Sequence, residues 1–355
     1  MGNPIAGWQD AYYMMYASSI TNSPDFSSAT ASGGTYGQGK PFVYLSNHPT
    51  FDINKGIIFT RKATGRSYIM KGGGTYMERT PGTVAPATTY EMDADVDAIF
   101  IPLITLFQPA TSAATNVNAG SVQTWTPYSS STVQHYASLL RVTENSQSHQ
   151  IVGAVAKSMA ISGEEGDSIK VSVEWTGANL STGVSSTVPS WSTTATASFL
   201  LFQDATFKFG TTSLDTSAAT ATDLSGFDLT VTNNVVSKHY DDVAMQRHIL
   251  ENFEVTGTIK VPWSSTVGGQ NTFLSKLIAG DDFLMYIYWG SSGASSAGDL
   301  ALHINAEVDS VNTTGGEDEA INEIAFTGIY DGTNYPIQIL VNSNVSRTAG
   351  YWLNA

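Results

Sequence analysis

The sequence predicts a mainly β protein built from two similar units in tandem, each with a short helix beside its strands. The first observation is alternation, because residues 168–175 switch regularly between polar and apolar side chains. The second is repetition, because VEWTG at 173–177 returns as IAFTG at 324–328. The third is composition: only 13% of the residues are charged and 41% are hydrophobic. Ser, Thr, Asn and Gly must therefore supply much of the polar surface.

Residues 1–41 predict a flexible N-terminal arm, because they mix Tyr, Met, Ser and Gly without a steady period. Three tyrosines cluster in this arm, and Tyr side chains give a large contact area at a low entropic cost. We therefore take Tyr12, Tyr13 and Tyr16 as candidate stacking contacts. Strand-like patterns begin at residue 42 and open the first unit, residues 42–180.

Within the first unit, residues 91–109 form a dense apolar run that opens with acidic residues. Asp97 is a candidate N-cap and Pro109 a stop, which predicts a helix, although Pro102 conflicts with its interior. The clearest hairpin follows at 157–176, with the turn GEEGD. Its apolar face carries Ile169, Val171, Val173 and Trp175.

A Ser/Thr-rich stretch, 181–198, predicts a linker to the second unit, residues 199–355. In that unit, 252–263 alternate as a strand and 271–280 predict a short amphipathic helix that ends at Gly280. The run DFLMYIYWG is apolar on both faces, which predicts a strand buried in the chain or covered by a neighbouring subunit. These strands carry Ile259, Val261, Met285 and Ile287.

The two halves follow the same order of phrases. GTYMERTP and the helix predicted at 91–109 parallel GTIKVPW and the helix predicted at 271–280. The two hairpins then end in the repeated Thr-Gly phrase. This order predicts an internal duplication. The alternative is that any antiparallel β protein offers strand–turn–strand phrases that can be matched by eye.

No constellation of residues points to catalysis, a cofactor or a metal. There is no cysteine, and no two of the six histidines form an HExxH motif. Asp93, Asp95 and Asp97 have the spacing of a calcium loop, but Ala98 and Ile104 stand where that loop needs Gly and Glu. The sequence therefore predicts a protein that is not an enzyme, with no cofactor and no metal site.

The charge balance is strongly acidic, with 31 acidic and 16 basic residues and a formal net charge of −15. This argues against binding of nucleic acid, which depends on Lys and Arg at phosphates. It is compatible with a surface that DNA slides past without sticking. The N-terminus has no basic leader, and no run reaches the roughly 18–20 apolar residues of a membrane span. We therefore expect a soluble chain made in a cytoplasm, with no membrane partner.

The order of phrases AKSMAISGEEGDSIKVSVEWTG, a Ser/Thr-rich loop, SGFDLTVTNNVVSKHYDD and NFEVTGTIKVPW resembles the tail tube (major tail) proteins of long-tailed bacteriophages. The resemblance covers 136–342, is weaker at 42–109 and is absent from 1–40. It implies tail-tube-like β-sandwich or barrel units with flanking helices, whose inner strands join a ring barrel. Longer members of the family are similar to two fused units, so that three chains form a pseudo-sixfold ring. Such rings stack into a tube.

The resemblance also implies partners: further copies of the chain, the tape-measure, tail terminator and distal tail proteins, and DNA that passes without sticking. The protein would be part of the virion tail and would assemble in the host cytoplasm. We expect the hairpin at 157–176 and strands 252–263 and 282–289 to contribute to the ring or lumen sheet, together with their eight apolar residues named above. Two alternatives stay open: a surface or secreted β-sandwich adhesin or glycan-binding module, and then an enzyme.

Overall fold

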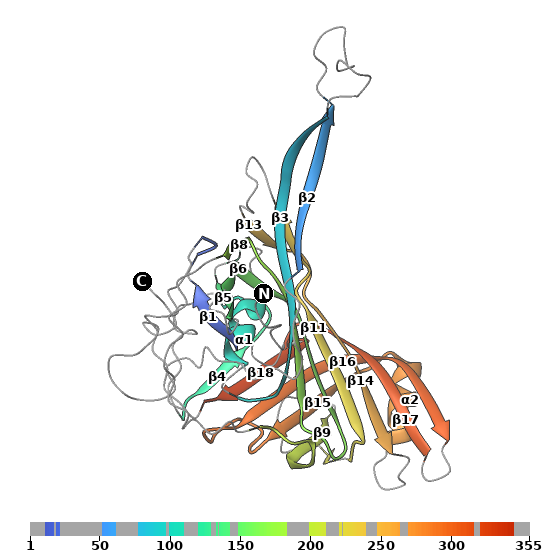
Figure 1. Cartoon of the computed structure of the whole chain (residues 1–355). Coiled ribbons are helices and arrows are strands. Elements are labelled where there is room, and N and C mark those ends of the chain that lie inside the picture. The colour runs from blue at the N-terminus through green and yellow to red at the C-terminus, as the bar shows by residue number, and fades with distance from the viewer. Residues whose placement is uncertain are drawn as a thin grey trace.

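The protein is mainly β, as the sequence predicts. The structure is a computed structural model and describes residues 11–17, 19–21, 52–61, 77–96, 99–109, 120–128, 133, 135–142, 148–182, 199–210, 220–221, 223–238, 247–262, 269–315 and 320–343. Within these ranges it has 18 β-strands and two α-helices. Sixteen of the strands belong to one antiparallel sheet, which curves through the molecule in Figure 1.

A first strand set comes from the N-terminal half of the chain. It consists of β1 (Ala11–Ala17), β2 (Asp52–Arg61), β3 (Met77–Asp93), α1 (Phe100–Phe107), β5 (Tyr136–Val142), β6 (Ser148–Glu164), β7 (Lys170–Thr176) and β8 (Asn179–Thr182). Its strands pair in the order β1–β5–β6–β7–β3–β2, and β8 also pairs with β6.

A second strand set comes from the C-terminal half. It consists of β9 (Ala205–Gly210), β11 (Gly226–Thr232), β14 (Glu254–Pro262), α2 (Gly269–Ala279), β15 (Asp282–Trp289), β16 (Leu300–Gly315), β17 (Ala320–Gly328) and β18 (Ile337–Asn342). Its strands pair in the order β9–β15–β16–β17–β14–β11, and β18 also pairs with β16. The elements of the two sets therefore follow the same order in the chain and in the sheet.

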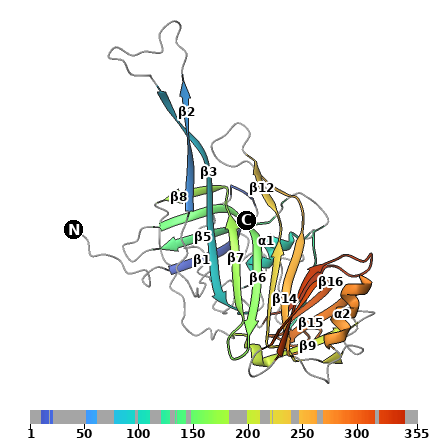
Figure 2. The same cartoon turned by 90° about the vertical axis from the view of Figure 1, so that its right-hand side faces the viewer.

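The two sets join into one sheet because β6 pairs with β11 over residues 158–164 and 226–232. The remaining elements are β4 (Val122–Trp125) on β18, β10 (Thr220–Ala221) on β9, the separate pair β12 (Val235–Lys238) and β13 (Arg247–Leu250), and a 3-10 helix (Phe202–Asp204). The outer part of the sheet is a long ribbon of β2 and β3, which stands clear of the other strands in Figures 1 and 2.

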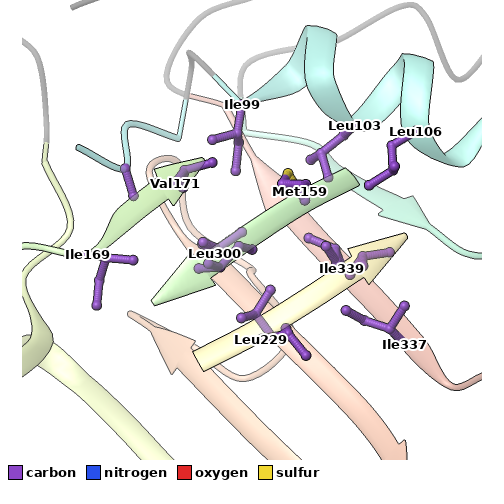
Figure 3. Close-up of a cluster of buried hydrophobic side chains, with 14 of the residues drawn as sticks. Ile99, Leu103, Leu106, Met159, Ile169, Val171, Leu229, Leu300, Ile337 and Ile339 are labelled. Atoms are coloured by element: carbon purple, nitrogen blue, oxygen red, sulfur yellow. The ribbon is translucent and has the colours of Figure 1, made fainter. Parts of the chain in front are cut away.

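Helix α1 lies at the centre of the hydrophobic core, and all eight of its residues are buried. Figure 3 shows its side chains Leu103 and Leu106 beside Met159 of β6, with Ile339 of β18 and Leu229 of β11 farther from the helix in the same cluster. One core cluster thus contains side chains of both strand sets. The separation of the chain into two units is therefore a matter of strand order and not of two separate cores.

The helices test two expectations about boundaries. Helix α1 begins at Phe100 with Ile99 at its N-cap, so the helix predicted within 91–109 starts later than a cap at Asp97 implies. The acidic start of that range belongs to strand β3, and Pro102 is tolerated because a residue in the first helical turn needs no N–H partner. Asp97 lies outside the described residues. Helix α2 ends as predicted, with Gly280 at a φ of 69° and its N–H bonded to the carbonyl of Lys276.

The hairpin predicted at 157–176 is confirmed as β6 and β7, and the run predicted to be apolar on both faces is β15. Residues 283–289 of β15 are all buried within the chain itself. Phe283, Met285 and Ile287 belong to the main core. On the other face, Leu284 and Tyr286 pack in a smaller cluster that includes Leu340.

The N-terminal segment corrects the prediction of a flexible arm. Residues 11–17 form β1, which pairs with β5, and the side chains of Tyr12 and Tyr16 are buried. The Tyr16 hydroxyl lies 2.6 Å from Nδ1 of His135. The expectation of flexibility is therefore wrong for these seven residues, and burial keeps Tyr12 and Tyr16 from acting as exposed stacking contacts in this conformation. The Tyr13 side chain lies outside the description.

Burial of His135 links the anchoring of β1 to pH. Desolvation lowers the pKa of His135 below its ordinary value of 6.5, although its hydrogen bond to the Pro109 carbonyl acts in the opposite direction. The unfolded chain then takes up the proton first, so stability is lost as pH falls from about 6.5 toward the folded pKa. We expect the free energy of unfolding to fall less between pH 7.5 and pH 5.5 in His135→Gln than in the wild type. Urea unfolding at both pH values tests this, and an unchanged difference would contradict it.

Candidate functional site

The eight residues predicted to mark the ring or lumen strands all lie in one hydrophobic core. Each of them is at most 2% exposed: Ile169, Val171, Val173, Trp175, Ile259, Val261, Met285 and Ile287. Their strands are central in the sheet, but these side chains point into the chain and cannot line a channel in this conformation. The surface that these strands offer is therefore the opposite face of the sheet.

That opposite face is polar and is continuous across both strand sets. One row of directly paired residues runs Glu91, Ser172, Ala160, Thr230, Thr256, Thr327 across six strands. Directly opposed residues in a sheet share a face, so the alternation of each strand extends into a common surface. We call it the polar face; it consists of Thr89, Glu91, Asp93, Ser158, Ala160, Ser162, Glu164, Lys170, Ser172, Glu174, Thr176, Asp228, Thr230, Thr232, Glu254, Thr256, Thr258, Lys260, Glu323, Ala325 and Thr327, none of which is buried.

The side chains of the polar face are small or acidic, and it has no large apolar residue. Seven carboxylates stand against two lysines in the set just given. The sequence analysis recognised the alternation of polar and apolar residues in the hairpin but named only the apolar residues of these strands as site residues. The signal was present, because a strand with one buried face must present its alternate residues on the other.

Each lysine of the polar face is held by a carboxylate. Lys170 Nζ lies 2.7 Å from Oδ1 of Asp93, and Lys260 Nζ lies 2.8 Å from Oε1 of Glu164. The hydrogen bond to Asp93 raises the pKa of Lys170. Partial burial raises the pKa of Asp93, but the hydrogen bonds that Lys170 and Ser168 donate to Asp93 hold its pKa below the ordinary range.

A third lysine, Lys157, projects from the bulge in β6 and lies 2.9 Å from Glu174. All three ion pairs are substantially exposed, so each contributes little to stability. Their main effect is on the charge of the surface. Each lysine is neutralised by its own carboxylate, and the other carboxylates make the polar face negative.

The strands that bear the polar face, β3, β7, β6, β11, β14 and β17, are followed in the sheet by β2 at one end and by β16 at the other. At one end β2 pairs only with β3 among the described strands. At the other end, β15 occupies one side of β16 as far as Glu307, and no described strand continues along that side to Gly315. Unpaired N–H and C=O groups along a strand are a template for pairing with another chain. The sheet is therefore open where a second molecule could extend it.

The structure offers no sign of a catalytic or metal centre within the residues it describes. No cluster of three or more His, Asp or Glu side chains there is arranged to hold a metal ion. Of the three aspartates at calcium-loop spacing, Asp93 bonds Lys170 and Asp95 is buried. Neither described helix has the length and hydropathy to cross a membrane.

The comparison with protein families agrees with the resemblance that the sequence shows. A family model described as phage tail tube protein matches residues 26–328, most of the chain. Among solved structures, the chain is similar to the SPP1 tail tube determined by solid-state NMR and cryo-EM. The two share 12% identity, the match covers 40% of this chain and 79% of that chain, and the TM-score is 0.32. A search of curated proteins gave no match. None of these findings supports an adhesin or glycan-binding module.

Proposed function

Because the chain belongs to the phage tail tube protein family, we propose that its copies join sheet edge to sheet edge into rings that stack into a hollow tube. The chain is a structural protein of the phage tail. In the proposal, the polar face lines the channel and the hydrophobic core with α1 and α2 forms the wall. The tube would conduct DNA during ejection, and the protein itself would catalyse no reaction and hold no cofactor or metal.

The polar face is the observation that carries this proposal. A conduit for DNA must be wettable, smooth and free of cations that would hold phosphates. The polar face meets these needs with Ser and Thr side chains, excess carboxylates and lysines already bonded to Asp93, Glu164 and Glu174. Like-charge repulsion between these carboxylates and the phosphate backbone would keep DNA moving.

We propose that each chain supplies two units to the ring, so that three chains make six. The identical order of elements in the two strand sets supports this internal duplication. The units would be 42–180 and 199–355 with a linker at 181–198, and the burial of β1 adds residues 11–17 to the first unit. A ring that closes the sheet across chains would leave no open strand edge in it.

Further partners follow from the place of such a tube in the virion. We propose contacts with tape-measure, tail terminator and distal tail proteins at the inside and the two ends of the tube, after assembly in the host cytoplasm. The Ser/Thr-rich stretches of the sequence are candidates for contacts between rings.

Electron microscopy of the purified full-length chain tests the proposal. We expect rings or tubes with a central hole at high protein concentration, and threefold symmetry in two-dimensional class averages. In a cryo-EM map, Thr230 and Thr256 should face the hole and Val171, Val173 and Ile259 should be buried in the wall. A compact monomer without a hole at high concentration, or a map with the polar face on the outer surface, would overturn the proposal.

A further inference from the structure

We infer that the open side of β16, together with the exposed end of α2, docks the β2–β3 ribbon of a second copy of this chain. The register would repeat the one by which β11 pairs with β6 inside the chain. This inference rests on the proposed ring and names its seam between chains. Three independent observations carry it: matching strand registers, matching bulges, and the different exposure of the two helices.

The two strand sets match in register as well as in order. In the first set, Ala87 of β3 pairs with Thr176 of β7. In the second set, Thr256 of β14 pairs with Thr327 of β17. Thr176 and Thr327 are each followed by Gly at the end of the strand. Each pairing continues for six more residues without a shift, so β3 corresponds to β14 position by position.

The bulges extend the correspondence to the long strands. In β6 the register shifts between Ala156 and Ser158, and in β16 it shifts between Val308 and Ser310. Each bulge lies in the part of the long strand that pairs with the next strand of its hairpin, β7 or β17. A bulge is a fixed feature of a strand, so the two bulges align β6 with β16. Ser158 therefore corresponds to Ser310. Two residues further on, Ala160 corresponds to Asn312.

Inside the chain, the side of β6 opposite β7 is occupied. Strand β11 pairs there, with Thr230 opposite Ala160. The corresponding side of β16, opposite β17, is open beyond Glu307 among the described strands, and the side chain of Asn312 is exposed. The second strand set thus repeats the docking edge of the first set, but no described strand occupies that edge.

The helices show the same difference. Helix α1 is covered by residues that flank β11 and β14: Asn233 Nδ2 donates a hydrogen bond to the Leu106 carbonyl at 2.9 Å, and the Phe253 ring lies 5.4 Å from that of Phe107. Helix α2 packs on β16 as α1 packs on β6, but Leu274 is 44% and Ile278 is 79% exposed. An apolar side chain exposed on the helix that repeats a fully buried one indicates a missing neighbour.

The missing neighbour is identified as β2, the strand of the first set that corresponds to β11. Strand β11 pairs with β14 through Thr230 and Thr256, and β2 pairs with β3 through Asp52 and Ala87. Ala87 corresponds to Thr256, so Asp52 corresponds to Thr230. The ribbon of β2 and β3 stands clear of the other strands in Figures 1 and 2, and an isolated two-stranded ribbon is only marginally stable in water.

The seam therefore has a definite register: Asp52 of one copy lies opposite Asn312 of the next. The β2–β3 ribbon near Lys55 and Val84 would then cover the exposed end of α2, because the same offsets make these positions correspond to Asn233 and Phe253, which cover α1. The same junction would thus occur once within each chain and once between neighbouring chains, and its repetition would close the ring.

Engineered cysteines test the register directly, because the chain has none of its own. We expect the double variant Asp52→Cys/Asn312→Cys to form intermolecular disulfides on mild oxidation of assembled protein, since directly opposed strand residues fall within disulfide reach. Non-reducing gels should show covalent dimers and a closed trimer. The matched control Ile58→Cys/Asn312→Cys shifts one cysteine six residues along β2, roughly 20 Å away, and should stay monomeric on the gel.

A second pair of variants tests the helix. Leu274→Asp/Ile278→Asp should abolish rings while thermal unfolding of the monomer stays within a few degrees of wild type, because both side chains are already exposed. Tyr330→Asp, at an equally exposed aromatic, should still form rings. If the α2 variant still forms rings and the Asp52→Cys/Asn312→Cys variant forms no crosslink, the seam is overturned and the proposed function stands. Wild-type protein that forms no ring would overturn both.

Discussion

Replacing Trp175 with alanine should lower the free energy of unfolding by about 3–5 kcal/mol, the range for a large aromatic removed from a packed core. Trp175 is 1% exposed on β7, in the core cluster that both strand sets share. Its ring contacts that of Tyr90 on β3 edge to face, with centroids 6.5 Å apart. Loss of the indole would leave a cavity between two central strands that cannot collapse without moving the sheet.

The matched control is Trp175→Phe, which keeps most of the ring. Among the described residues, Trp175 Nε1 is buried without a hydrogen-bond partner, so the smaller ring also removes an unsatisfied donor. We expect it to cost well under half of the alanine effect, and Tyr330→Ala on the surface to cost less than about 0.5 kcal/mol. Urea unfolding at concentrations too low for assembly measures all three. A loss of less than 1 kcal/mol in Trp175→Ala would contradict the packing described.

Placing lysines on the polar face should convert a channel that passes DNA into one that retains it. Ala160, Thr256 and Ala325 suit this change because their cross-strand neighbours are Ser and Thr, not carboxylates. A lysine at each position would therefore not be offset by an opposite carboxylate, as Lys170 and Lys260 are. We expect tubes of the triple variant to hold double-stranded DNA at low salt, whereas wild-type tubes release it.

The salt dependence distinguishes this effect from misfolding. The logarithm of the binding constant should fall against the logarithm of salt concentration with a slope of roughly −0.9 for each phosphate neutralised. The triple glutamine variant at the same positions is the matched control, with long side chains but no charge, and it should release DNA like wild type. Cosedimentation of DNA with tubes at several salt concentrations measures both. Triple-lysine tubes that release DNA as readily as wild type would show that the polar face does not line the channel.

The same physics explains why a low-charge, Ser/Thr-rich chain suits this role. A sheet surface in a channel needs hydration without strong charges, and hydroxyl groups provide it at small volume. In the proposed channel, the three lysines near the polar face would hold DNA little, because Asp93, Glu164 and Glu174 bond them. Removing one of these carboxylates would leave a cation at the surface, so in the proposed channel the ion pairs would matter for the passage of DNA although they contribute little to stability.

The sequence by itself determined those features that depend on neighbouring residues. Alternation at 170–176 fixed both the strand and its two faces, and an unbroken apolar run fixed β15 as buried on both. Gly280 fixed the end of α2. The order of phrases pointed to the family that the comparison then matched over residues 26–328. These features were predictable because side-chain periodicity and capping are local.

Only the tertiary structure decided which strands meet. Nothing local in residues 11–17 predicted a core strand, because β1 owes its place to pairing with β5 more than a hundred residues away. Helix α1 begins at Phe100 only after β3 has extended through Asp93 beside β7 and Asp95 has bridged to Phe199, a residue far along the chain. The pairing of β6 with β11, which joins the two strand sets into one polar face, was likewise invisible. A strand's own residues specify which of its faces is buried, but its partner is chosen by the edges that the rest of the fold leaves open.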